Sequence, residues 1–370
     1  MTSRSRRPLG QPRTSDTSSS EFTDGGQSVG EARREPNDAA ARLRDSESVV
    51  SLLAEQECVQ AFQALGWARV GHGHFYRDPT TGKMREVDVT ARCSVTKARK
   101  SGNLSASITV FVELKSIPGY HVVFAPSAEG DNDCCAITSW CGYSVDDDDA
   151  LSLLARLGLD ARQAVLVANR FRRSAYPRGH SRVWPIQVDP PKRAEVCTAF
   201  RETNIGQEKD LDASVVWRAM QSVWAATEAA RQRDKDVWVE SLVSAAKSAR
   251  LFHEDPLPIL FRNFDFSART IAAFHPAVVC GANLWLLRNS ELRPVPFVRF
   301  IEVAGSQPPR WCDVISKQAF PEWLTELTGH YAKASDRTAP PRFDRRFAEG
   351  VVDAMLKSMG RRSIFERGGE

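Results

Sequence analysis

REVDVTA at residues 85–91 and SITVFVELKS at residues 107–116 are the two stretches that decide the fold. Both alternate between polar and apolar residues, which is the two-residue period of a β-strand with one buried face. Because a slip of one residue would turn the apolar faces to solvent, the pattern fixes the register of both strands. The expected apolar faces are Val87, Val89 and Ala91 in the first stretch and Ile108, Val110, Val112 and Leu114 in the second.

The segments around these strands predict helices and further strands. Residues 49–65 carry apolar residues at helical spacing, and Gly66 ends that run. The sequence DPTTG at residues 78–82 has turn chemistry, so a strand-like segment before it is joined to the first quoted strand. A long helix over residues 212–231, extending past Asp234, completes a mixed α/β domain. Other strands are expected at residues 122–124, 164–168, 183–188, 257–261, 277–280 and 296–303, and other helices at residues 150–157, 320–327 and 342–360.

Composition places the chain among ordinary globular proteins. Of its 370 residues, 42% are hydrophobic and 26% charged, which excludes collagen-like, coiled-coil and wholly disordered chains. The formal net charge of +4 does not by itself indicate a nucleic-acid partner, but it is compatible with a local basic channel. No stretch reaches the roughly 20 apolar residues of a membrane helix, and eight dispersed cysteines fit reduced thiols. We therefore expect a cytoplasmic protein with no membrane partner.

The chain divides into three parts by composition. Residues 1–45 are rich in Ser, Arg, Gly and Pro with hardly any large apolar residue, so we expect a disordered N-terminal lead. Residues 46–330 would form the folded domain, although residues 125–208 do not fit its common core and are interpreted as an insertion. Residues 331–370 are expected to form a C-terminal helical tail.

Asp88 on the first quoted strand and Glu113 and Lys115 on the second are the candidate chemical groups. Residues two apart in a strand project from the same face, so Glu113 and Lys115 point the same way. Two carboxylates and one ammonium would be wasteful there for stability alone. They suit Mg²⁺, which prefers oxygen ligands and also binds substrate phosphate. The alternative is a solvated ion pair between Glu113 and Lys115, which would contribute little.

Asp88 followed by Glu113-Leu114-Lys115 at the end of an apolar strand resembles the signature of the PD-(D/E)XK nuclease superfamily. Residues 78–88, with TGKMREVD at their end, resemble the turn that leads to the metal-binding Asp in bacterial members. The helix before them, with Glu55, Cys58, Phe62 and Gly66-Trp67, resembles the first helix of that fold. One departure is Val87, which stands where the superfamily name has Pro.

The resemblance implies a restriction-endonuclease-like core, with a mixed central sheet flanked by helices, and metal-dependent hydrolysis of phosphodiester bonds. Asp88 and Glu113 would hold Mg²⁺, or Mn²⁺ in its place, with Glu55 contributing directly or through water. Lys115 would orient or deprotonate the attacking water. Glu86 would support the ligands by hydrogen bonds, or face solvent as an ordinary strand residue.

The partner that the resemblance implies is nucleic acid, and DNA in a restriction, defence or repair setting. Cutting both strands would suit a homodimer. Basic side chains that could contact phosphates, or simply be solvated surface, are Lys83, Arg85, Lys97, Arg99, Lys100, Arg172 and Arg173. The competing function is a catalytically silent module that keeps the nuclease fold to bind nucleic acid or a partner protein.

Overall fold

The computed structural model describes residues 36–97, 104–115, 119–126, 140–141, 194–204, 207–208, 214–251, 270–302, 310–337, 345–358 and 360. The chain divides into two compact units, residues 1–46 and residues 47–370. The expected helix at residues 150–157 and the expected strands at 164–168, 183–188 and 257–261 lie outside the described residues.

In the described part of the first unit, helix α1 (Pro36–Arg44) forms where we expected only a disordered lead. Composition alone undervalued the short run Ala39 to Ala41, since alanine is the strongest helix former. Proline is favoured at the first helical position, where its missing N–H costs nothing. Arg42 and Arg44 lie in the last turn, where positive charge complements the helix dipole.

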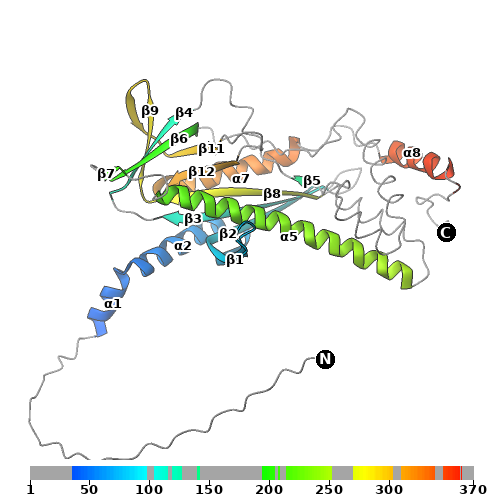
Figure 1. Cartoon of the computed structure of the whole chain (residues 1–370), viewed down its shortest axis with the longest axis horizontal. Helices are drawn as coiled ribbons and strands as arrows, with labels where there is room; N and C mark the ends of the chain where they lie inside the picture. The colour runs from blue at the N-terminus through cyan, green and yellow to red at the C-terminus, as the bar shows by residue number, and fades with distance from the viewer. Residues whose placement is uncertain are drawn as a thin grey trace, which may run out of the picture. The chain divides into compact units, whose positions relative to one another are not determined.

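The second unit is built on one large mixed sheet (Figure 1). Its main path runs β1-β2-β3-β8-β12-β11-β6-β4-β9-β10, with β5 paired to β8 and β7 to β6. β3, β8 and β12 are parallel neighbours, whereas β1, β2 and β3 form an antiparallel meander. The strands are β1 (Ala68–Arg77), β2 (Met84–Lys97), β3 (Leu104–Lys115), β4 (His121–Pro126), β5 (Trp140–Cys141), β6 (Glu195–Asn204), β7 (Gln207–Glu208), β8 (Thr270–Cys280), β9 (Asn283–Arg288), β10 (Glu291–Pro294), β11 (Phe297–Glu302) and β12 (Arg310–Ser316).

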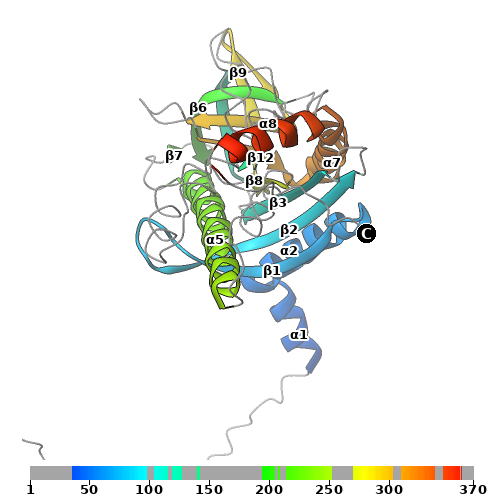
Figure 2. The same ribbon diagram turned by 90° about the vertical axis from the view of Figure 1, so that its right-hand side faces the viewer.

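Helices cover both faces of this sheet (Figure 2). Helix α5 (Val215–Leu251) packs on one face, where its residues Val216, Met220 and Val223 join Phe111 of β3 in one apolar core. Helices α2 (Glu47–Ala64) and α7 (Phe320–Arg337) pack on the other. A short 3-10 helix, η3 (Lys317–Ala319), precedes α7, and α8 (Arg345–Ser358) follows it. The α/β class with a mixed sheet flanked by helices is therefore confirmed.

The start of α5 is fixed by a carboxylate from the sheet. Glu202 of β6, which is buried, accepts the N–H groups of Val215 and Val216 at 3.0 and 2.9 Å. Those N–H groups have no partner within the helix, and a carboxylate there also meets the positive end of the helix dipole. Glu202 thereby sets the position of α5 on the sheet and of every side chain that α5 presents.

Strict alternation breaks in β2, where Val87 and Val89 belong to opposite cores. Val89 packs with α2, but Val87 packs with α5, so the expectation that Val87, Val89 and Ala91 share one face is wrong at Val87. Gly73 of β1 stands opposite Asp88, between the pairs His72↔Val89 and His74↔Val87, and its φ is +58°. Glycine accepts this backbone conformation at no steric cost.

Three expectations about boundaries were wrong. Residues 125–208 are not simply an insertion, because β6 lies inside the sheet between β11 and β4. The boundary at residue 330 divides α7, whose Tyr331 is buried in the core. The polar, basic composition of residues 92–105 favours a connection between the two quoted strands, but β2 continues as a strand up to Lys97. β9, β10 and β12 were not predicted, because short strands without clear alternation carry little periodic signal.

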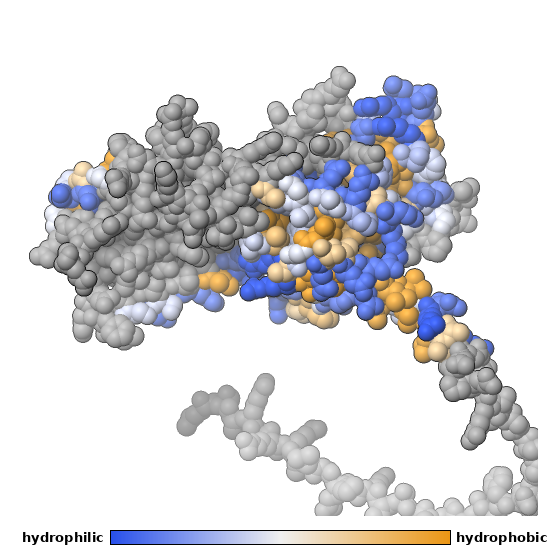
Figure 3. Space-filling model, turned by 180° about the vertical axis from the view of Figure 1, so that it is seen from behind, coloured by the Kyte–Doolittle hydropathy of each residue, from blue (hydrophilic) through white to orange (hydrophobic). Residues whose placement is uncertain are grey.

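The second unit exposes apolar side chains at the beginning of α2. Val50, Leu52 and Leu53 are each 40% or more exposed, and Figure 3 shows hydrophobic residues at this end of the helix, at the lower right of the view. Among the described residues, no helix combines the length and apolar character needed to span a membrane.

Candidate active site

The candidate site forms where β2 and β3 separate. Their ladder ends at the pair Val89↔Val112, so Asp88 and Glu113 lie just beyond the last paired residues. The carboxylate of Asp88 accepts the main-chain N–H of Leu114 at 2.7 Å, which replaces the next ladder hydrogen bond. A side chain therefore bridges the two strands at this point, and the opening between them leaves polar groups in reach of solvent.

Asp88, Glu113 and Lys115 converge at this opening. The Lys115 Nζ lies 2.7 Å from Glu113 Oε2 and 3.7 Å from Asp88 Oδ2. Both carboxylates are thus within reach of one ammonium group, as the alternation in β3 and the position of Asp88 predicted. The side chains of Asp88 and Lys115 are 24% and 30% exposed, so small solutes can reach both groups.

Burial and charge act differently on the two acids and the amine. Burial, followed by the negative charge of Asp88, raises the pKa of Glu113, and the nearby Lys115 only partly offsets this. Burial works to lower the pKa of Lys115, but the carboxylates of Glu113 and Asp88 outweigh it and raise that pKa. Lys115 therefore remains an ammonium ion, which favours its orienting water or phosphate over its removing a proton.

Ser222 of α5 is a site residue that sequence reasoning missed. Its hydroxyl donates to Glu113 Oε1 at 2.8 Å, so Glu113 is held by Lys115 on one oxygen and by Ser222 on the other. Tyr76 of β1 donates to the main-chain carbonyl of Ser222 at 3.0 Å. The available signal was Ser222 itself, a polar residue beside the apolar stripe of a helix that the sequence had predicted.

Glu55 of α2 borders this cluster from the opposite face of the sheet. Burial and then the charge of Asp88 raise the pKa of Glu55, and the charge of Glu86 adds to the effect. His72 Nδ1 lies 3.6 Å from Glu55 Oε2. Glu86 is exposed, and its Oε1 lies 2.5 Å from the position that a Cβ at Gly73 would take, so a side chain at Gly73 would displace the Glu86 carboxylate.

The basic residues expected to contact nucleic acid have different outcomes. Arg85 is exposed and pairs with Asp78 of the β1–β2 turn at 2.5 Å. Lys83 is exposed in the same turn. Lys97 is the last residue of β2. Arg99, Lys100, Arg172 and Arg173 lie outside the described residues.

Within the described residues, no group of three or more His, Cys, Asp or Glu side chains is placed to hold a metal ion. The residues present nevertheless suit one kind of ion. Mg²⁺ typically binds one or two carboxylates and completes its shell with water and substrate phosphate. Asp88 and Glu113 supply two. Burial and then the charge of Asp88 raise the pKa of Glu113, so a further cation would favour its ionised form.

Comparison of the chain with protein-family models, curated proteins and solved structures finds no match. The resemblance to PD-(D/E)XK nucleases therefore rests on the sequence motifs quoted above.

Proposed function

We propose that this protein is a metal-dependent nuclease that hydrolyses phosphodiester bonds in DNA. The observation that carries the proposal is the convergence of Asp88, Glu113 and Lys115 where β2 and β3 separate, with Lys115 Nζ within 3.7 Å of both carboxylates. The fold agrees with the proposal at a coarser level, because the resemblance implies a mixed sheet flanked by helices.

Each side chain has a role that its environment permits. Asp88 and Glu113 would hold a divalent cation, with Glu55 near enough for the charge of Asp88 to raise its pKa. Mg²⁺ or Mn²⁺ bound there would polarise the scissile phosphate and make water more acidic. Lys115, as an ammonium ion, would donate hydrogen bonds to the attacking water and to the phosphate as negative charge grows on it.

The overall change is hydrolysis. Water adds to phosphorus, the bond between phosphorus and one ester oxygen breaks, and that oxygen leaves as an alcohol after taking up a proton. Ser222 and Leu114 contribute by position, since Ser222 fixes one oxygen of Glu113 and the Leu114 N–H fixes Asp88.

The test is cleavage of supercoiled, linear and single-stranded DNA in Mg²⁺ or Mn²⁺, with chelator as the blank. Asp88→Asn is the informative variant, because its amide oxygen can still accept the Leu114 N–H while the charge is lost. Glu57→Gln is the matched control, because Glu57 lies on α2 and pairs with Lys317 on the surface. We expect metal-dependent cleavage by the parent and the control and loss of cleavage in Asp88→Asn.

The second candidate function is the silent nuclease-fold module. It would be favoured if the parent protein, shown to be folded, cleaves none of the three substrates with either metal. Binding of DNA without cleavage would then identify a nucleic-acid-binding module and would overturn the proposed nuclease.

A further inference from the structure

A pocket of about 720 Å³ lies beside the candidate site on the face of the sheet that α5 covers. The β1–β2 turn forms one wall, α5 forms another, and residues of β8 and β12 close the remainder. Its volume is in the range of sites that take small molecules or single nucleotides. It therefore has room for a ligand group, and the chemistry of its lining indicates which one.

Arginine dominates the charge of the lining. Four guanidinium groups border the pocket from three separate elements: Arg85 of β2, Arg218 and Arg231 of α5, and Arg310 of β12. Among the described residues of the lining, the carboxylates are Asp78, which pairs with Arg85 at 2.5 Å, and Glu228, which pairs with Arg231 at 2.7 Å. Counted over these described residues, four arginines and two acids give a net charge of +2. An anionic ligand is therefore favoured.

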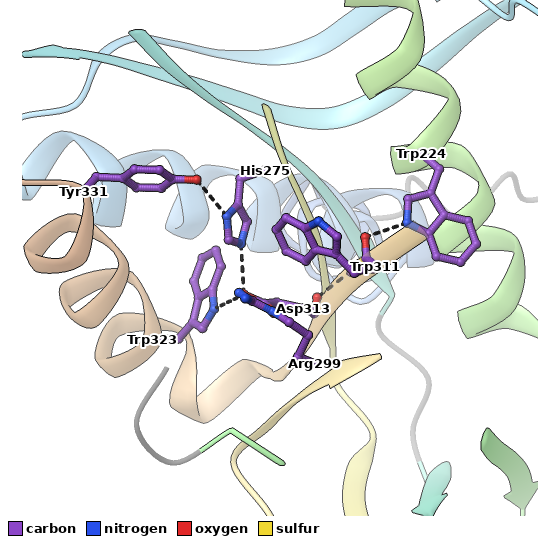
Figure 4. Close-up of polar contacts among 8 residues, drawn as sticks. Trp224, His275, Arg299, Trp311, Asp313, Trp323 and Tyr331 are labelled. Atoms are coloured by element: carbon purple, nitrogen blue, oxygen red, sulfur yellow. Dashed lines mark hydrogen bonds and ion pairs between the residues drawn. The ribbon is translucent and has the colours of Figure 1, made fainter. Parts of the chain in front are cut away.

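Aromatic rings stand next to these arginines. Trp224 and Trp311 both line the pocket, and the Trp224 indole N–H donates to the main-chain carbonyl of Trp311 at 2.7 Å (Figure 4). The Arg310 guanidinium lies 6.0 Å from the Trp224 ring centroid. The hydrogen bond holds α5 and β12 together at the pocket floor. Arginine beside aromatic surface is the combination that proteins use for the phosphates and bases of single-stranded nucleic acid.

Ser222 connects the pocket to the candidate active site. It lines the pocket and also donates to Glu113 Oε1 at 2.8 Å. A ligand in the pocket would thus lie one side chain away from the carboxylate proposed to hold the cation. The arginines carry the guanidinium geometry that binds phosphate oxygens in pairs.

We infer that this pocket binds the phosphates of the nucleic-acid strand adjacent to the scissile bond, an inference that rests on the proposed nuclease function. Arg218, whose Nε also donates to the main-chain carbonyl of Ser214 at 3.2 Å, and Arg310 would bind the phosphates through their guanidinium N–H groups. A free nucleotide carries the same phosphate chemistry, and the experiment distinguishes the two sources.

The experiment measures binding of a short fluorescein-labelled single-stranded oligonucleotide by fluorescence anisotropy, in chelator so that neither metal nor cleavage is needed. The double variant Arg218→Gln/Arg310→Gln is compared with Arg201→Gln/Arg288→Gln, which removes two exposed arginines outside the pocket. We expect the pocket variant to bind about tenfold or more weakly and its salt dependence to fall by roughly 1 to 2 in log–log slope. The control should differ little from the parent.

A second variant guards against loss of folding. Gln221→Glu replaces an exposed pocket residue by one of equal size whose negative charge repels phosphate. This variant should weaken binding without unfolding the protein. Gln60→Glu, exposed on α2, is its control. Equal weakening in pocket and control variants, or no binding by the parent, would overturn the inference. A deoxynucleoside triphosphate that binds the parent more tightly than the oligonucleotide, and loses affinity in the pocket variant, would assign a free nucleotide instead.

The two proposals fail separately. Pocket-dependent binding by a protein that cleaves nothing overturns the nuclease and keeps the phosphate pocket. Cleavage that survives while the pocket variants bind like the parent keeps the nuclease and overturns the pocket.

Discussion

Two clusters of acidic and basic side chains lie on opposite faces of the same sheet. Each contains a buried carboxylate, but the two carboxylates have different sets of partners. Glu113 faces α5 and shares one ammonium, that of Lys115, with Asp88. Asp313 lies on the other face beneath α7, with His275 and Arg299 (Figure 4). Both acids are buried, at 5% and 1% exposure, so burial alone does not distinguish them.

The difference is in the number of partners. Arg299 Nε donates to one oxygen of Asp313 at 2.7 Å, and the other oxygen accepts from Arg299, His275 and Trp323 within 3.1 Å. Burial acts to raise the pKa of Asp313, but Arg299 and His275 outweigh it and hold that pKa far below its usual range. The pKa of Glu113 moves upward instead.

The comparison indicates which cluster stabilises the fold and which cluster can still gain from binding a cation. A fully paired buried charge is costly to break, because removing one partner leaves the other charge uncompensated. A carboxylate whose ionised form is disfavoured gains when a further cation arrives. We therefore assign Asp313 to stability and Glu113 to function, and each assignment can be tested by mutation.

The largest expected effect is on stability. Asp313→Ala removes the carboxylate that neutralises buried Arg299, so the free energy of unfolding should fall by about 3–5 kcal/mol. Urea denaturation followed by circular dichroism measures it. Asp236→Ala, an exposed α5 aspartate, should change stability by less than about 0.5 kcal/mol. A loss below about 1 kcal/mol in Asp313→Ala would remove the contrast with Glu113.

The next effect is on cleavage. Glu113→Gln keeps an oxygen that can accept from Ser222 but removes the charge that would hold a cation. The rate of metal-dependent cleavage should fall by about 10²–10³-fold, while unfolding free energy changes by less than about 1 kcal/mol. Single-turnover plasmid cleavage and urea denaturation give the two values. A strongly destabilised variant would place Glu113 in the same class as Asp313.

The strand pair that carries Asp88, Glu113 and Lys115 could be predicted from sequence, because strand periodicity acts over two residues. The contact that completes the cluster could not, since Ser222 lies 109 residues from Glu113. The same limit applies to Asp313, Arg299 and His275, which come from three different strands. Sequence patterns indicated apolar strands at residues 277–280 and 296–303, near His275 and Arg299, but none at Asp313. They did not indicate which charges meet, because pairing of distant strands is set by the whole sheet.

Glu55 tests whether the α2 face of the sheet contributes to metal binding, and the expected effect of replacing it is smaller than that of replacing Glu113. The charge of Asp88 raises the pKa of Glu55, and His72 is a second neighbour of the Glu55 carboxylate. Glu55→Gln should lower the apparent affinity for Mn²⁺ by about tenfold, as changes in groups that support metal ligands do. Isothermal titration calorimetry measures the affinity, and Glu57→Gln on the same helix should match the parent. An unchanged affinity for Mn²⁺ in Glu55→Gln would show that the proposed metal site uses only side chains of β2 and β3.

The smallest effect is on the pH dependence of stability, and its sign separates the two acids. The raised pKa of Glu113 means that the folded protein retains a proton which the unfolded chain releases above the ordinary value of 4.5. Its contribution to stability is present below 4.5 and lost as pH rises through the raised pKa. The lowered pKa of Asp313 has the opposite sign, so its contribution is present above the ordinary 3.8 and lost on acidification.

Glu113→Gln isolates the first contribution. In chelator, its unfolding free energy relative to the parent should increase from pH 4.5, the ordinary pKa of Glu113, towards neutral pH. Urea denaturation across that range measures the difference. Mn²⁺ should reduce the difference by stabilising the parent alone, because a bound cation favours the ionised carboxylate. If the difference instead falls as pH rises, the ion pair with Lys115 stabilises ionised Glu113, and this cluster serves the fold as Asp313 does.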